Sequence, residues 1–88
     1  MKHESHPEVV KRLKRANGHL TSVIAMIENG RKCVDLAQQL HAVECAITNA
    51  KRALIHDHIE HCLNEGADPA EPIAHATLDE FRRLARYL

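Results

Sequence analysis

The sequence predicts an all-α protein built from three helices, and three observations indicate this class. Apolar residues recur at spacings of three and four along two long stretches, as they do on one face of an α-helix. No stretch alternates polar and apolar residues in the manner of a strand. With one Phe, one Tyr and no Trp in 88 residues, the core must consist of Ala, Leu, Ile and Val, which suits closely packed helices. We expect a single domain over residues 1–88.

The first helix is expected over residues 7–29, after an arm over residues 1–6 that we expect to be flexible. Pro7 suits the first helical position, and Gly30 is typical of a residue that ends a helix. Gly18 lies mid-helix at a cost near 1 kcal/mol relative to Ala, so we expect another backbone to come close there. The apolar positions with helical spacing are Val9, Leu13, Ala16, Leu20, Val23, Ile24 and Ile27.

The second helix, expected over residues 34–64, has the most regular apolar pattern in the chain. Its apolar residues are separated alternately by four and three positions, which resembles the seam of a coiled coil. These residues are Leu36, Leu40, Val43, Ile47, Ala50 and Leu54.

A linker over residues 66–76 follows, with prolines that interrupt helical structure. The segment from Thr77 to Glu80 has the form of a capping box, so a third helix is expected over residues 77–88. Its buried stripe would consist of Leu78, Phe81, Leu84 (or Ala85) and Leu88.

Two long amphipathic helices with a short connection form a helical hairpin, which alone exposes too much of its apolar seam. A chain of this length buries only roughly 60–65% of its unfolded surface. Association is the usual remedy for such a thin core. We therefore expect two hairpins to form an antiparallel four-helix bundle as a homodimer.

Cys33, His58 and Cys62 are candidate metal ligands. His58 and Cys62 are four residues apart, so on a helix they lie on the same face, one turn apart. A thiolate and an imidazole placed in this way suit a soft or borderline metal ion. On one unbroken helix, Cys33 and His58 would be roughly 37 Å apart. The three residues can therefore share a metal only if two copies of the helix run antiparallel.

The charge of the chain is unevenly distributed, although the formal net charge is zero. The first 32 residues hold seven basic and three acidic residues. This basic third of the chain indicates a polyanionic partner such as DNA, although a basic helix face can also be merely solvated. Four of its residues form the run Lys11, Arg12, Lys14 and Arg15.

Three cysteines are an odd number, and we find neither a signal peptide nor a transmembrane stretch. These features favour a reduced, cytoplasmic location over a secreted disulfide framework, and we expect no membrane partner.

The residues from Lys11 to Leu20, together with Cys33 and the His58-x-x-x-Cys62 motif, resemble the copper-sensitive operon repressors. This resemblance implies a dimer of dimers that binds double-stranded operator DNA without metal and releases it when metal binds across the subunit boundary. In copper sensors the ion is Cu(I) with two sulfur ligands and one nitrogen ligand. Here those ligands would be Cys33 of one subunit with His58 and Cys62 of its partner.

The resemblance also implies roles for residues outside the metal site. Glu80 falls near the place of an acidic residue that supports the ligands in some members of the family. Arg12 and Arg15 lie in the stretch that such repressors use to contact phosphates. Asn49 departs from the pattern, because copper sensors commonly carry a functional Arg near that point. Two basic residues further along the second helix, Lys51 and Arg52, are candidates to replace it.

Other metals are alternatives to Cu(I). Ni(II) or Co(II) would require a further nitrogen or oxygen ligand. The nickel and cobalt sensors of the family take it from an N-terminal His, and this chain has His3 and His6 on its arm and His61 near the proposed ligands. Zn(II) is a further alternative.

The remaining Cys and His residues have structural interpretations. Cys45 is expected to be a packing residue beside the apolar seam. His19 and His41 are expected to lie on the surface or to form hydrogen bonds. A metal-storage or chaperone bundle would use the same ligands without binding DNA. A thiol enzyme is disfavoured, because so short a chain has no loop to form an oxyanion hole, and we predict that the protein is not an enzyme.

Overall fold

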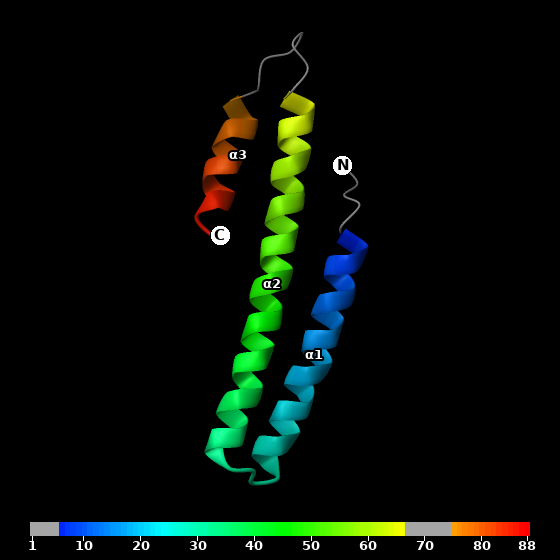
Figure 1. Cartoon of the computed structure of the whole chain (residues 1–88), viewed down its shortest axis with the longest axis vertical. Helices are drawn as coiled ribbons and strands as arrows, with labels where there is room; N and C mark the ends of the chain where they lie inside the picture. The colour runs from blue at the N-terminus through cyan, green and yellow to red at the C-terminus, as the bar shows by residue number, and fades with distance from the viewer. Residues whose placement is uncertain (1–5, 67–74) are drawn as a thin grey trace.

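The computed structural model describes residues 6–66 and 75–88, and for residues 62–66 and 75–77 it describes the backbone alone. The described residues form three α-helices and no strand, which confirms the all-α class. Helices α1 and α2 form an antiparallel hairpin, and α3 runs along the other end of α2 (Figure 1). Residues 1–5 of the predicted arm and residues 67–74 of the predicted linker lie outside the described residues, whereas His6, also assigned to the arm, is helical. The helices are α1 (His6–Glu28), α2 (Cys33–Gly66) and α3 (His75–Ala85).

The turn between α1 and α2 depends on Gly30, as predicted. Gly30 has a φ of 74°, a left-handed conformation that disfavours residues with a side chain. Its N–H donates to the carbonyl of Ile27 at 3.1 Å, and the N–H of Arg31 donates to the carbonyl of Met26 at 3.1 Å. These two bonds form a Schellman motif, which satisfies the last carbonyls of α1 and reverses the chain.

Helices α1 and α2 differ from the predicted ranges by one or two residues at each end. Helix α1 covers His6–Glu28 where residues 7–29 were predicted, because the Schellman turn already includes residue 29. Helix α2 covers Cys33–Gly66 where residues 34–64 were predicted. Its first intrahelical bond runs from the N–H of Leu36 to the carbonyl of Lys32 at 3.0 Å, so Cys33 is already helical.

Helix α3 covers His75–Ala85, so it begins two residues before the predicted capping box and ends three residues before the chain does. The last three residues leave the α-helical pattern because their N–H groups bond to carbonyls three residues back, at 3.0–3.4 Å. Such bonds tighten the final turn of a helix. The prediction of a helix over residues 77–88 is corrected accordingly.

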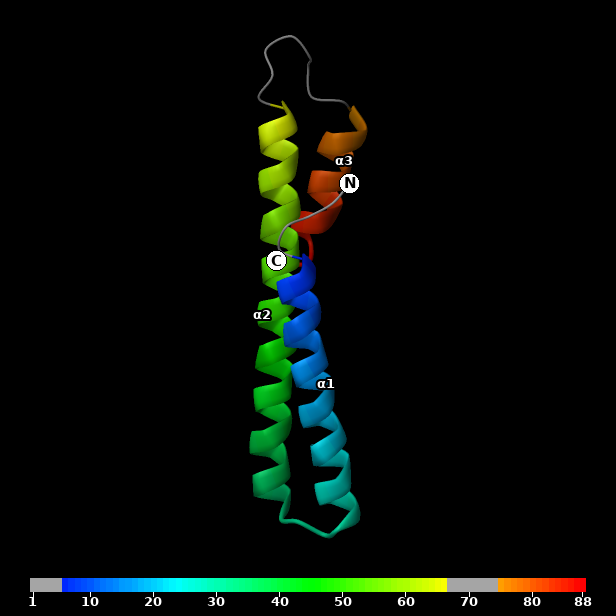
Figure 2. The same cartoon turned by 90° about the vertical axis from the view of Figure 1, so that its right-hand side faces the viewer.

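The buried residues that recur at intervals of seven along α1 and α2 are valines and alanines. Val9, Ala16 and Val23 are buried at intervals of seven on α1, and Val43 and Ala50 are buried at the same interval on α2. Small side chains at these positions allow the two helices to lie close together over the whole length of α1 (Figure 2). The buried core of the described chain is therefore narrow.

Larger apolar side chains remain exposed along the hairpin, although the sequence pattern placed several of them in the core. On α2, Leu40, Ile47 and Leu54 are 42%, 45% and 40% exposed. Their counterparts on α1 are Val10, Leu13, Ile24 and Ile27, which are 42–52% exposed. We call these seven residues the open apolar face. The regular seam predicted on α2 is thus divided between positions that pack against α1 and positions that stay exposed in the single chain.

Within residues 6–66 and 75–88, none of the helices combines the length and the apolar character that a membrane-spanning segment requires.

Gly18 does not mark a close approach of another backbone, which corrects the sequence-based expectation. A Cβ atom built at this position would meet no atom within 4 Å. Gly18 is exposed, because it faces away from α2. The described protomer therefore gives no packing reason for a glycine at this point of α1.

The two glycines of the hairpin should respond in opposite ways to alanine. Gly18→Ala should raise the free energy of unfolding by about 0.5–1 kcal/mol, because alanine has the better helix propensity and open space around it. Gly30→Ala should lower it by about 1–2 kcal/mol, because alanine is strained at a φ of 74°. Urea unfolding at one fixed protein concentration measures the free energies of unfolding of both variants. A destabilised Gly18→Ala variant would contradict the exposed position of Gly18.

Candidate functional site

Cys33 and His58 lie near opposite ends of α2, and the helix between them is continuous. Twenty-five residues at 1.5 Å each separate them by roughly 37 Å. The same 25 residues make nearly seven turns, so both residues lie on the same face of the helix. Within the described residues, no group of three or more His, Cys, Asp or Glu could hold a metal ion. A single chain therefore does not bring Cys33 and His58 together.

The face of α2 that carries Cys33 also carries the α2 residues of the open apolar face. Leu40, Ile47 and Leu54 follow Cys33 at successive intervals of seven residues, and an interval of seven is close to two helical turns. Cys33 itself is exposed. One side of α2 thus has a thiol at its start, exposed aliphatic residues along its middle and an imidazole toward its end.

His58 contacts α3 through Glu80. Its Nε2 atom is buried and lies 3.0 Å from Oε1 of Glu80, which is an ion-pair distance without the angular geometry of a hydrogen bond. The His58 side chain is 23% exposed and that of Glu80 is 55% exposed. Helix α3 therefore places a carboxylate directly beside the ring of the predicted ligand.

The other predicted ligands are only partly described. Cys62 lies on α2 one turn beyond His58, and its side chain is outside the described residues. His3 is also outside them. His6, the first residue of α1, and His61 on α2 are half-buried, and each interacts with other groups of the protein.

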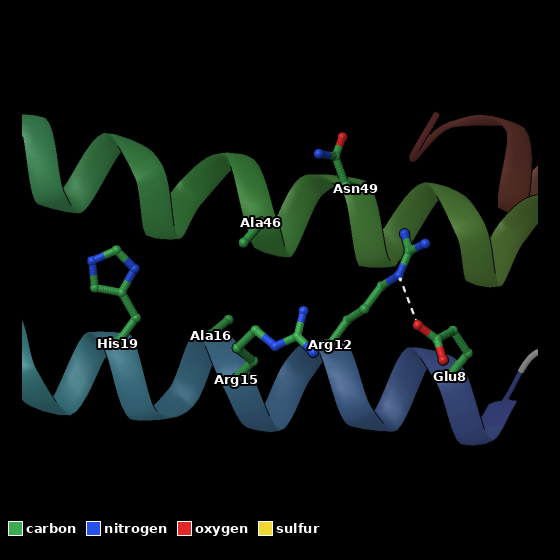
Figure 3. A pocket seen from close by; sticks show the side chains of 7 residues that line it. All are labelled: Glu8, Arg12, Arg15, Ala16, His19, Ala46 and Asn49. Atoms are coloured by element: carbon green, nitrogen blue, oxygen red, sulfur yellow. Dashed lines mark ion pairs between the residues drawn. The ribbon is translucent and has the colours of Figure 1, made fainter.

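Arg12 and Arg15 border a hollow between α1 and α2 (Figure 3). By helical spacing, this hollow lies on the side of the hairpin away from the open apolar face. The hollow has a volume of about 390 Å³. The Arg12 side chain extends from α1 toward α2, and its Nε lies 3.7 Å from Oε1 of Glu8 (Figure 3). Asn49 is on α2 (Figure 3). The same hollow is also lined by Ala16, His19 and Ala46. Asn49 is thus the polar α2 residue beside the two arginines.

The remaining predicted basic residues lie elsewhere on the surface. Lys11 and Lys14 are exposed on α1 and do not line this hollow. Lys51 is exposed 18 residues, or five turns, after Cys33, and so it is on the face of α2 that carries Cys33. Arg52 lines a different hollow on α2. Neither Lys51 nor Arg52 therefore occupies the place of Asn49 beside Arg12.

His19 links the two long helices. Its Nε2–H donates to Oε1 of Gln39 at 2.6 Å, and the pair is partly buried. This bond confirms the expectation that His19 is a surface or hydrogen-bonded residue. It also fixes the start of α2 against the middle of α1, a function for Gln39 that the sequence pattern did not indicate.

Cys45 is exposed, so the prediction that it is a packing residue is wrong for the protomer. Cys45 is two residues from the buried Val43, and two residues turn a helix by about 200°, away from α1. Its Sγ lies 3.6 Å from Nε2 of His41, which is also exposed. The sequence signal for this pair was the spacing of four residues, which it shares with His58 and Cys62.

Comparisons with known proteins give a consistent result. Residues 5–86 match the family of metal-sensitive transcriptional repressors. The copper-sensing transcriptional repressor CsoR of Bacillus subtilis is 32% identical over 91 aligned positions, which cover 98% of this chain and 90% of that protein. CsoR of Mycobacterium ulcerans is 42% identical over 55 residues, or 62% of this chain.

The chain spans about half the length of the mycobacterial CsoR proteins that it matches, 47% in the case of the M. ulcerans protein. Among solved structures, that of the nickel-responsive transcriptional regulator InrS is similar, with a TM-score of 0.82 and 28% sequence identity. The similarity covers 100% of this chain and 98% of that chain. The similar proteins thus include sensors of copper and of nickel.

Proposed function

The chain belongs to the family of metal-sensitive transcriptional repressors, and we propose that it binds operator DNA without metal and leaves it when Cu(I) binds. This is a family of regulators and not of enzymes. The cytoplasm, where DNA and a reduced thiol pool coexist, is the location that we propose.

The proposed Cu(I) site lies between two subunits, with Cys33 from one and His58 and Cys62 from the other. The observation that carries this proposal is the face of α2 on which Cys33 and His58 lie at opposite ends of an exposed apolar stripe. A second copy in antiparallel orientation would cover that stripe and bring the start of one α2 beside the end of the other. The open apolar face of α1 would join the same interface and complete a four-helix bundle. We propose that two such dimers form the DNA-binding tetramer.

The donor set fits Cu(I). Two thiolates and one imidazole are soft ligands that suit a low-coordinate Cu(I) ion, and the relatives from Bacillus subtilis and Mycobacterium ulcerans are copper-sensing. The bound ion would supply bonds that connect the beginning of one α2 to the end of its partner.

Glu80 would orient His58 for this role. A metal-binding His commonly has a carboxylate or carbonyl partner at its other ring nitrogen, which fixes the ring and strengthens the metal bond. Nε2 of His58 lies 3.0 Å from Glu80, so we assign Nδ1 to the metal. Since Glu80 belongs to α3, this contact would also transmit metal binding to the last helix.

Ni(II) or Co(II) is the second candidate effector, because the similarity to the nickel-responsive InrS extends over the whole chain. This alternative requires at least one more nitrogen or oxygen ligand. The histidines at positions 3, 6 and 61 are the candidates for it. Cu(I) remains our first choice, because two thiolates favour the softer ion.

The DNA-binding surface that we propose is the basic side of α1, on the opposite side of the hairpin from the open apolar face. Arg12 and Arg15 would bind phosphates, with Lys11 beside them. Lys14 lies one turn after Val10, so it would add positive charge at the edge of this surface. The exposed ion pair of Arg12 with Glu8 is a weak competitor for a phosphate, because such pairs contribute about 0–1 kcal/mol. Asn49 borders the same hollow and can donate a hydrogen bond to a phosphate oxygen.

A tenfold to hundredfold loss of DNA affinity requires about 1.4–2.7 kcal/mol of coupling between the metal and the DNA. The metal ligands and the DNA surface share two rigid helices, so a change in how two hairpins pack also changes the spacing of their basic surfaces. His19 would carry this coupling, because its bond to Gln39 ties α1 to the first turns of α2.

Substitution of the two proposed sulfur ligands should separate metal response from DNA binding. Each of the variants Cys33→Ala and Cys62→Ala should bind the DNA upstream of the protein's own gene normally. Cu(I) should no longer release either variant from that DNA, because each has lost a sulfur ligand. Cys45→Ala is the matched control and should still respond. Fluorescence anisotropy of labelled DNA measures the effect.

Mixing the two variants tests whether the site spans subunits. A dimer of one Cys33→Ala and one Cys62→Ala subunit keeps one intact site, formed by the cysteines that each subunit retains. Neither variant alone should bind Cu(I) tightly, whereas the mixture should regain binding after subunit exchange. A mixture that stays inactive would rule out a site shared between chains.

Glu80→Gln should weaken Cu(I) binding by about 10–100-fold, because the carboxylate that orients His58 is lost. Asp79→Asn is the control, because Asp79 is the adjacent acidic residue and pairs with Arg83 at 2.9 Å instead. Competition with a chromogenic Cu(I) chelator measures the affinities. Equal effects of the two substitutions would refute a specific role for Glu80.

Replacement of Arg12 and Arg15 by alanine should weaken DNA binding on all sequences. The slope of log K against log salt should fall by about one unit for each phosphate that the variant no longer neutralises. Arg86→Ala, which removes an exposed arginine near the end of the chain, is the control. An unchanged salt slope in the double variant would show that phosphates bind elsewhere.

A further inference from the structure

We propose that His41 and Cys45 form a second metal site in each subunit, suited to a borderline cation of the Zn(II) class and separate from the inter-subunit site. Both residues are exposed on α2, and Sγ of Cys45 lies 3.6 Å from Nε2 of His41. A helix presents residues four apart as adjacent ligands, as it does in the His pair of the HExxH zinc motif.

The distance between the two donor atoms fits a tetrahedral ion. A Zn–S bond of about 2.3 Å and a Zn–N bond of about 2.0–2.1 Å place the donors roughly 3.6 Å apart at a tetrahedral angle. Sγ of Cys45 and Nε2 of His41 have this separation as a hydrogen-bonded pair, so an ion would replace the hydrogen bond while the two donor atoms keep their spacing. Cys45 would bind as a thiolate, with its proton released to solvent, and the neutral imidazole of His41 would bind through Nε2.

The surroundings leave room for an ion and for water as its remaining ligands. The pair lines a shallow hollow of about 240 Å³ on α2. Glu44 and Arg52 line the same hollow, so a carboxylate and a guanidinium offset each other beside the ion. Thr48 and Asn49 complete the lining with neutral polar groups. An N,S donor pair excludes hard cations such as Mg²⁺ and Ca²⁺, which prefer oxygen ligands.

This pair belongs to one subunit and lies on a different face of α2 from Cys33. Position 45 is 12 residues, or about three and one-third turns, beyond Cys33, which places it roughly 120° around the helix. The site would therefore form without a second chain. It would be weaker than a three-ligand site, because only two protein groups bind the ion.

The test uses a full-length chain with Cys33→Ala and Cys62→Ala, in which Cys45 is the only one of the three cysteines left. Titration with Co(II) should produce a thiolate-to-metal charge-transfer band with one ion per subunit, and Zn(II) should displace it. Adding His41→Ala should weaken Co(II) binding at least tenfold, and adding Cys45→Ser should remove the band. His56→Ala, which removes another exposed histidine of α2, should leave the affinity unchanged.

Absence of the band in the chain that keeps only Cys45 would overturn the proposal. So would an affinity that His41→Ala leaves unchanged or that His56→Ala lowers equally. Because both proposed sulfur ligands of the inter-subunit site are absent from this background, the outcome is independent of whether that site exists. Circular dichroism of each variant confirms that the helices are retained, as expected for substitutions at exposed positions.

Discussion

The rigidity of α2 is the constraint from which the proposed mechanism follows. A helix of 34 residues is about 50 Å long, and its fixed rise keeps Cys33 roughly 37 Å from His58 whatever the other helices do. No loop movement within one chain can bring the two residues to a common ion. Their shared face is also the one that carries exposed aliphatic side chains. A metal ion shared by Cys33 and His58 would therefore have to lie between two chains, where its binding would change how they pack.

The composition of the core leads to the same conclusion from energetics. The hairpin buries small residues such as Ala16 and Ala50, whereas leucine and isoleucine side chains of both long helices remain 40–52% exposed. Full burial of one such large side chain contributes about 1.5–3 kcal/mol. A second chain that covered the open apolar face would therefore add hydrophobic stabilisation that the single chain does not gain. Folding, assembly and formation of the metal site would then depend on the same contact, and a ligand that binds the assembly stabilises all three.

The local signals in the sequence predicted the fold well, because the helices are set by periodicity and by Gly30, whose conformation depends on its nearest neighbours. The burial of individual side chains was harder to predict, because it depends on which neighbouring helix covers each face. The regular apolar seam on α2 is divided between two faces, since Val43 is buried and Ile47 is 45% exposed. A period near 3.5 does not indicate how many neighbouring helices cover the seam. For the same reason Cys45 was expected to be a packing residue beside the seam, although it is exposed. Glu80 was expected near the metal site from family resemblance, and the structure places it against His58. The linker sequence alone could not have indicated that pairing.

Helix α2 carries the spacing His-x-x-x-Cys twice, in two different environments. Because of this difference, one pair would only bind an ion, whereas the other would also transmit the binding to other helices. His41 and Cys45 are exposed, with the thiol at 3.6 Å from the imidazole, so this pair would hold an ion without involving another helix. His58 is 23% exposed and contacts α3 through Glu80, so a change in the position of His58 would also displace Glu80 and α3. A cation at the first pair would alter only the local charge. A cation bound by His58 would act on α3 and on the partner chain together. Identical ligand spacing can thus support a simple binding site in one place and a switch in the other.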